Sequence, residues 1–258
     1  MGISMEVLEQ YYPIFAVIIV PLIIFIVLIS YIWFKDKYER EPAGLVMLMF
    51  FWGAGVAFLS LLIENSAQGL MTSLYFAILF APFLEELLKG LGLLLLSRHK
   101  EYEGIMDGLV YGVAVGAGFA FLGDALYGLS FLYTGTFMAA LTAVLTRSLI
   151  EPLAHPFFSA WFGAEIGKSK MRIKGPKDEI IEIRVGGRIT SFIVALLTVF
   201  TLHALWNYVA IMSIIDITQA SLHAILVIVL FISLFICKIK DGVAFEKLVF
   251  EVPSKRRK

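Results

Sequence analysis

Residues 12–34 read YPIFAVIIVPLIIFIVLISYIWF and contain no charged side chain. Because an α-helix rises 1.5 Å per residue, a helix of this length crosses a hydrocarbon core of about 30 Å. The stretch lacks the basic start and the small-residue cleavage site of a signal peptide. We therefore predict that it stays in the protein as a membrane anchor.

Apolar stretches of similar length recur along the rest of the chain, near 43–63, 74–96, 106–133, 137–165, 190–213 and 219–237. Apolar residues make up 60% of the 258 residues, which is more than a soluble core of this size can bury. We predict an all-α, polytopic protein of about seven transmembrane helices that spans the lipid bilayer of the cell membrane.

The basic residues predict the orientation of these helices. Nineteen of the 21 Lys and Arg residues lie after the first, third, fifth and last apolar segments. Because Lys and Arg accumulate in cytoplasmic loops, we expect the N-terminus outside and the C-terminus in the cytoplasm. The chain then divides into a transmembrane bundle over 1–237 and a basic cytoplasmic tail over 238–258.

Net charge and cysteine content exclude several classes of function. The formal net charge is zero, so the charge balance indicates no nucleic-acid partner. The single cysteine, Cys237, excludes an intrachain disulfide and a metal site built from cysteines.

Glycine and proline positions predict how two of the segments pack. Gly108, Gly112 and Gly116 recur at every fourth position of the fourth segment, so a neighbouring helix can approach its backbone closely. Pro152 and Pro156 interrupt the fifth segment and free backbone carbonyls that need partners inside the bundle.

Ionisable side chains also lie within the apolar segments: Glu85, Glu86, Lys89, Asp124, Arg147, Glu151, His155 and His203. Insertion scales assign Asp, Lys or Arg near a helix centre a cost of about 2.5–3.5 kcal/mol each. Counted from the predicted outer helix ends, four of the eight lie about 13–18 Å deep. We expect these residues to face the protein interior.

Two interpretations of these residues remain open. In the first, Glu85 with Lys89 and Arg147 with Glu151 are ion pairs, and His203 with Asn207 forms hydrogen bonds between helices. In the second, paired carboxylates and histidines converge from three helices to form a functional site. The clustering of so many such groups favours the second interpretation.

An EExxK motif, Glu85-Glu86-Leu87-Leu88-Lys89, lies on the third segment. It is accompanied, in order, by DKYEREP at 36–42, DGLVYGVAVGAGFA at 107–120, His155, and HALWN at 203–207. This ordered set resembles the PrsW family of intramembrane proteases, related to the CAAX prenyl protease and bacteriocin-processing superfamily. The resemblance implies a protease-like core over about 36–213.

The chain departs from the family pattern at one position. The family usually carries Glu-Asn after the Phe-Ala of the fourth helix, where this chain has Gly123 and Asp124. Asp124 lies one residue along, so it can replace the missing carboxylate only after a rotation of about 100° or through a local bulge. A catalytically silent scaffold that binds transmembrane helices is therefore an alternative.

The resemblance implies an endopeptidase that cleaves a membrane-anchored protein, such as an anti-sigma factor, near the outer half of the bilayer. Glu85 or Glu86 would activate water, and Lys89 would set the charge of the pair. His203 and Asn207 would face the oxyanion. The predicted catalytic residues are Glu85, Glu86, Lys89, Asp124, His155, His203 and Asn207.

The same residues allow a metal-dependent mechanism. Glu86, His155 and His203 would bind zinc and leave a fourth position open. The chain lacks the HExxH signature, and no ligand pair lies on one helix, which favours the version without metal. A proton-coupled transporter is the alternative from another class, although no inverted repeat is apparent.

Cysteine labelling tests the orientation. In a chain whose own Cys237 is replaced, single cysteines at Ser73 and Thr134 should react with an impermeant thiol reagent added to intact cells, because both lie in predicted outer loops. Cysteines at Ser169 and Ser254 should be protected. The opposite pattern would reverse the predicted topology.

Overall fold

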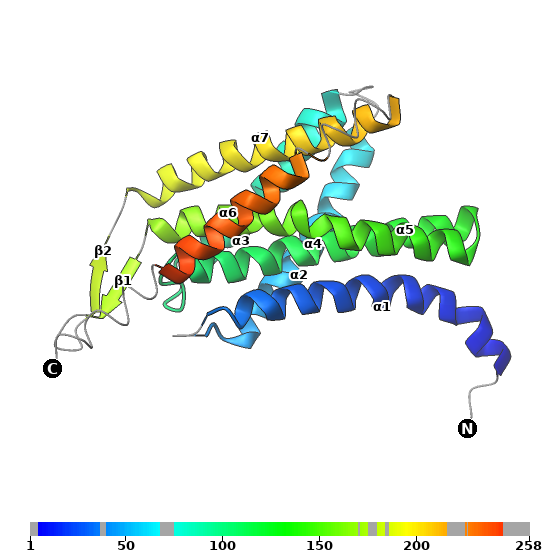
Figure 1. The fold of residues 1–258 in the computed structure, drawn as a ribbon, viewed down its shortest axis with the longest axis horizontal. Helices are drawn as coiled ribbons and strands as arrows, with labels where there is room; N and C mark the ends of the chain where they lie inside the picture. The colour runs from blue at the N-terminus through cyan, green and yellow to red at the C-terminus, as the bar shows by residue number, and fades with distance from the viewer. Residues whose placement is uncertain are drawn as a thin grey trace.

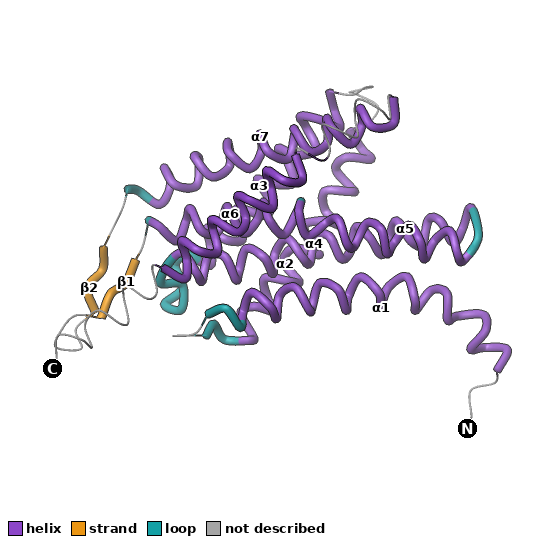
Figure 2. Tube along the Cα trace, in the orientation of Figure 1, coloured by secondary structure: helices purple, strands orange, loops and turns teal. Residues whose placement is uncertain are grey.

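The computed structural model describes residues 5–36, 40–67, 75–169, 171–174, 180–183, 186–215, 225 and 227–244. Long helices lie side by side in an elongated bundle, and a small β-hairpin projects at one end (Figures 1 and 2). The elements are α1 (Met5–Trp33), α2 (Ala43–Ala67), the π-helical turn η1 (Phe76–Phe80), α3 (Ala81–Leu96), α4 (Ile105–Thr134), α5 (Phe137–Ile150), the 3-10 turn η2 (Glu151–Leu153), α6 (His155–Lys168), β1 (Met171–Lys174), β2 (Ile180–Ile183) and α7 (Arg188–Ile215).

The predicted class of multi-pass helical membrane protein is confirmed. Within the described residues, five helical stretches are long and apolar enough to span a membrane: Tyr11–Trp33, Ala43–Ala67, Ile105–Thr134, Phe137–Lys168 and Arg188–Met212. The predicted segment at 74–96 forms η1 and α3 and carries three charged side chains. The predicted segment at 219–237 lies partly outside the described residues, so the number of seven stays a prediction.

Strands form only a minor part of the described chain. β1 and β2 pair antiparallel, with Met171 opposite Ile183 and Lys174 opposite Ile180. The hairpin lies between α6 and α7, in the loop that the sequence predicts to be cytoplasmic.

The predicted helix at 137–165 is broken at its two prolines. α5 ends at Ile150, and α6 begins at His155 after the short turn η2. Pro152 lies within η2 and Pro156 in the first turn of α6, where a residue without a backbone N–H is tolerated. The break therefore places His155 at a helix start.

The last described helical stretch runs over 227–244 and continues past the predicted boundary at 237. Lys238 is buried there, forms an ion pair with Glu165 of α6, and lies 4.1 Å from the centre of the Trp161 ring. The start of the predicted tail thus packs on the bundle. The division into domains stays a prediction.

α4 is the central helix, with α1, α2, α5 and α6 packed around it and its most extensive contact made with α6. The glycines at every fourth position of α4 explain this contact. A Cβ atom at Gly112 would lie 2.2 Å from the carbonyl oxygen of Ser159, and one at Gly116 equally close to that of His155. The glycines therefore bring the α6 backbone, including His155, directly against α4.

Replacing Gly112 with alanine should lower the free energy of unfolding by about 1–3 kcal/mol, the usual range for overpacking a buried contact. The measurement is denaturant unfolding of the purified protein in detergent. Gly55→Ala is the matched control, because a Cβ at Gly55 meets no atom within 4 Å. Equal losses of stability in the two variants would contradict this account of the α4–α6 contact.

Candidate active site

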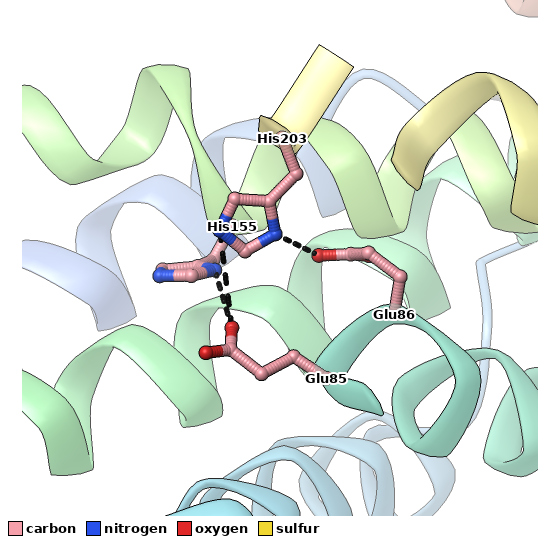
Figure 3. Close-up of side chains that lie close together, drawn as sticks. All are labelled: Glu85, Glu86, His155 and His203. Carbon is pink, nitrogen blue, oxygen red and sulfur yellow. Dashed lines mark hydrogen bonds and ion pairs between the residues drawn. The ribbon is translucent and has the colours of Figure 1, made fainter. Parts of the chain in front are cut away.

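Four ionisable side chains from three helices meet inside the bundle (Figure 3). Glu85 and Glu86 come from α3, His155 from the start of α6, and His203 from α7. Atoms of these side chains that can bind a metal ion all lie within 4.8 Å of one another. The structure thus brings together the four residues around which the predicted site was built.

Aromatic side chains hold the two imidazoles in place. The ring of Phe119, on α4, lies 4.5 Å from that of His155, and the ring of Phe158 stacks on His203 at 5.0 Å. The two imidazole rings are 5.0 Å apart and nearly perpendicular. Because such packed rings cannot rotate freely, the directions of their nitrogens are defined.

Glu85 lies between the two imidazoles. Its Oε2 is 3.8 Å from Nδ1 of His155 and 3.9 Å from Nε2 of His203. The opposite nitrogens face other carboxylates: Nε2 of His155 is 3.5 Å from Oε2 of Glu151, and Nδ1 of His203 is 2.9 Å from Oε1 of Glu86. Each ring therefore has one nitrogen toward Glu85 and the other toward an orienting carboxylate.

Lys89 is fully buried beside this group and pairs with Glu86. Its Nζ lies 2.5 Å from Oε1 of Glu86, 3.2 Å from Nδ1 of His155, and 4.4 Å from the centre of the Phe119 ring. The expected ion pair between Lys89 and Glu85, four residues apart, is therefore not formed. Lys89 pairs instead with Glu86, three residues away. This leaves Oε2 of Glu85 buried without a hydrogen-bond partner.

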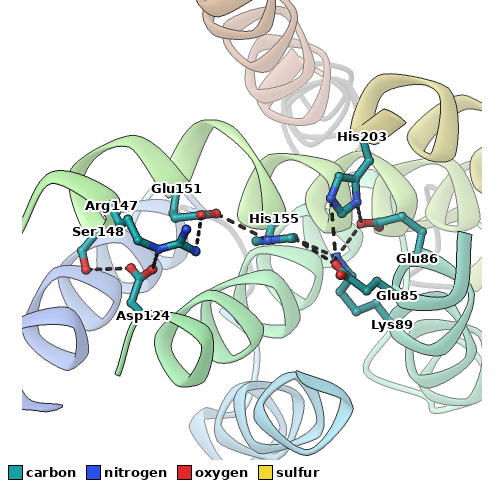
Figure 4. Close-up of polar contacts among 9 residues, drawn as sticks. All are labelled: Glu85, Glu86, Lys89, Asp124, Arg147, Ser148, Glu151, His155 and His203. Atoms are coloured by element: carbon teal, nitrogen blue, oxygen red, sulfur yellow. Dashed lines mark hydrogen bonds and ion pairs between the residues drawn. The ribbon is translucent and has the colours of Figure 1, made fainter. Parts of the chain in front are cut away.

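A second polar group continues from Glu151 away from the histidines (Figure 4). Arg147 donates to Oδ1 of Asp124 and to Oε1 of Glu151, both at 2.9 Å, and Ser148 donates to Oδ2 of Asp124 at 2.7 Å. The expected ion pair between Arg147 and Glu151 is present. Asp124 holds Arg147 and does not join the glutamate–histidine group.

Asn207 also lies outside the glutamate–histidine group. Its side-chain amide donates to the backbone oxygen of Ala77 in η1, at 2.8 Å. The hydrogen bond between helices that was expected of Asn207 is therefore present and joins α7 to η1, whereas the catalytic role of Asn207 stays a prediction.

Two carboxylates near the site were not among the predicted catalytic residues. Glu151 contacts His155 directly, and its spacing of four residues from His155 was the signal in the sequence. Glu64, near the end of α2, interacts electrostatically with Glu85. It lies one residue beyond the segment predicted at 43–63, so no signal in the sequence places it near the site.

The donor atoms fit a divalent metal ion. Two imidazoles and a carboxylate are a common protein ligand set, and a carboxylate behind each imidazole is the usual support for such ligands. Oε2 of Glu85 and Oε2 of Glu86 are both buried without a hydrogen-bond partner, which is the condition that a bound cation relieves. The ammonium group of Lys89 lies beside the same donor atoms, with its Nζ 3.2 Å from Nδ1 of His155.

Comparison with known proteins identifies a protein family that this chain resembles. The profile of the "PrsW family intramembrane metalloprotease" matches residues 41–236. "Protease PrsW" of Geobacillus kaustophilus is 32% identical over 153 residues, which cover 58% of this chain and 64% of that protein. "Protease PrsW" of Bacillus subtilis is 34% identical over 156 residues, covering 58% and 69%.

The similarity extends over part of each relative. The match to the Geobacillus protein spans less than two thirds of its length. A longer match, to "Protease PrsW" of Oceanobacillus iheyensis, is 28% identical over 186 residues and covers 70% of this chain and 77% of that protein. No solved structure matches the chain.

Proposed function

Because this chain belongs to the PrsW family of intramembrane metalloproteases, we propose that it is an endopeptidase that cleaves a membrane-anchored protein within the bilayer. The observation that carries the proposal is the group of Glu85, Glu86, His155 and His203, buried where helices of a membrane bundle meet. Family membership favours this activity over the proton-coupled transporter that the buried charges also allow.

The substrate we propose is a protein with a single membrane span, of the anti-sigma-factor type, cut near the middle of the bilayer at a site reached from the outer side. Two features support this choice: the predicted orientation of the chain and the predicted depth of Glu85 below the outer surface, about 18 Å, which is close to the middle of a hydrocarbon core of about 30 Å. A cut at that depth releases the substrate's outer domain from its anchor.

Glu85 is the residue best placed to activate water without a metal ion. Its Oε2 is buried, has no hydrogen-bond partner and lies between the two imidazoles. The carboxylate takes a proton from water, the resulting hydroxide attacks the peptide carbonyl carbon, and the leaving nitrogen receives the proton as the C–N bond breaks. Glu86, which pairs with Lys89, positions the imidazole of His203.

The residues that would hold a zinc ion are His155, His203 and Glu85. Zinc at such a site supplies polarisation of a carbonyl group and activation of a water molecule. Glu85 replaces Glu86 in this ligand set because its Oε2 lies between the two imidazoles, 3.8 Å from Nδ1 of His155 and 3.9 Å from Nε2 of His203. The family description, which names a metalloprotease, favours a metal-dependent mechanism over the version without metal that the sequence spacing favoured.

The departure at Gly123 is compatible with activity. Glu151 contacts His155 on the side opposite Glu85, so this histidine retains an orienting carboxylate. A Cβ atom at position 123 would meet no atom within 4 Å.

Zinc content separates the two mechanisms. We expect close to one zinc ion per chain by elemental analysis of the detergent-purified protein, because two histidines and a carboxylate form a complete ligand set. The His155→Ala, His203→Ala double variant should lose it. Glu165→Gln, which changes a carboxylate outside the site, should keep it. Protein that cleaves substrate with no zinc would establish the version without metal.

Glu85→Gln should reduce cleavage by at least about 100-fold, the lower end of the contribution of a general base. The amide keeps the shape of the side chain but removes the charge that accepts a proton or binds a metal. The measurement is cleavage of a panel of tagged single-span proteins in liposomes that contain the purified enzyme.

Glu165→Gln is the control for the loss of a partly buried carboxylate, and its cleavage rate should match wild type. Cleavage by Glu85→Gln at the wild-type rate would exclude Glu85 from the chemistry. If wild type cleaves no substrate but supports proton-coupled uptake that Glu85→Gln abolishes, the protein is a transporter.

A further inference from the structure

A second group of carboxylates lies at the N-terminal end of α4. Asp36 follows α1, Glu41 precedes α2, and Asp107 is in the first turn of α4. One carboxylate oxygen from each lies within 4.8 Å of the other two, and the side chains of Asp36 and Glu41 are buried. Three acidic groups this close repel one another unless a positive charge or a proton joins them.

Glu41 is the member of this group with the most carboxylate oxygens that lack a hydrogen-bond partner. The residue is only 4% exposed, and both of its carboxylate oxygens are buried without a hydrogen-bond partner. The hydroxyl of Tyr111, one helical turn beyond Asp107, is also buried and has no hydrogen-bond partner. Buried polar groups in proteins are nearly always satisfied, so these atoms indicate a bound species.

The described basic residues do not supply the missing charge to Glu41 or Asp107. Within the part of the chain that the structure describes, neither carboxylate forms an ion pair with a Lys or Arg side chain. Arg40, adjacent to Glu41 in the chain, has its guanidinium 5.1 Å from the centre of the Phe34 ring.

We propose that Asp36, Glu41 and Asp107 together bind one hard divalent cation, Mg²⁺ or Ca²⁺. All the donors are carboxylate oxygens, which these cations prefer, and the group contains no histidine or cysteine to favour zinc. A divalent charge offsets most of the repulsion among three carboxylates.

The competing occupant is a single proton. Burial, with repulsion from Asp107 and Asp36, raises the pKa of Glu41 to about 10. Without a cation, Glu41 is therefore protonated at neutral pH. A cation and a proton both relieve the repulsion among the three carboxylates. Metal binding by the protein therefore distinguishes the two occupants.

The backbone around the group is already held in place. The indole nitrogen of Trp33 donates to the backbone oxygen of Glu41 at 3.0 Å, and Oδ2 of Asp107 accepts from the backbone nitrogen of Gly104 at 3.0 Å. A cation bound here joins the connection between α1 and α2 to the start of α4. The site is separate from the glutamate–histidine group, so the inference does not depend on the proposed protease activity.

Manganese binding tests the proposal, because Mn²⁺ takes oxygen ligands and its free form is counted by electron paramagnetic resonance. The experiment uses the full chain in detergent with His155→Ala and His203→Ala, which removes the histidine ligands of the other site. We expect one Mn²⁺ bound per chain. Displacement by Mg²⁺ or by Ca²⁺ at the lower concentration identifies the preferred cation.

Glu41→Gln in the same background should weaken Mn²⁺ binding at least about 10-fold, the lower end of losses for disturbed metal sites. Its thermal midpoint without metal should stay close to that of the parent, because the amide is uncharged, like the protonated carboxyl group that it replaces. Glu101→Gln, at a surface carboxylate paired with Lys100 at 3.4 Å, is the control and should bind Mn²⁺ normally.

Asp107→Asn provides a second variant, because asparagine retains an oxygen that can accept the hydrogen bond from Gly104. It should also weaken Mn²⁺ binding. Unchanged binding in both Glu41→Gln and Asp107→Asn would overturn the proposal. Absence of saturable Mn²⁺ binding in the parent would overturn it too, and would assign the group to a shared proton.

Discussion

The buried ion pair between Lys89 and Glu86 is the interaction on which the arrangement of the site depends. Both side chains are fully removed from solvent, and a charge in that position is stable only with a close partner. Lys89 satisfies one oxygen of Glu86, and His203 approaches that same oxygen from α7. Glu86 thus connects α3 to α7 through His203. Because Lys89 pairs with Glu86, Glu85 has no charged partner on α3.

The consequence is that two adjacent glutamates have different environments. Glu86 is engaged on α3 and α7, whereas Oε2 of Glu85 faces both imidazoles and bonds to neither. Two identical carboxyl groups can therefore serve two roles, one in positioning and one in chemistry, as paired carboxylates in enzymes commonly do. The contact between Glu151 and His155 extends this division to the second histidine.

Close packing of α4 against α6 positions His155 in the site. Gly116 allows the backbone of His155 to approach α4, and the prolines near His155 end one helix and start the next at that level. The same helix carries Asp107 in its first turn, where the connection between α1 and α2 meets it. α4 thus links a candidate reaction centre and a candidate cation site through one rigid element.

The sequence by itself determined the membrane class, the positions of the long helices and the identity of the glutamates and histidines that meet. The length of each apolar stretch is enough to predict a membrane-spanning helix, because helix formation depends on residues that are neighbours along the chain. The ordered motifs are enough to identify the glutamates and histidines. Tertiary structure alone decided that Lys89 pairs with Glu86, that Asp124 holds Arg147, and that Asn207 bonds η1. Helical periodicity defines which face a side chain occupies, but the partner on the next helix depends on helix rotation and distance, which no spacing within one helix encodes.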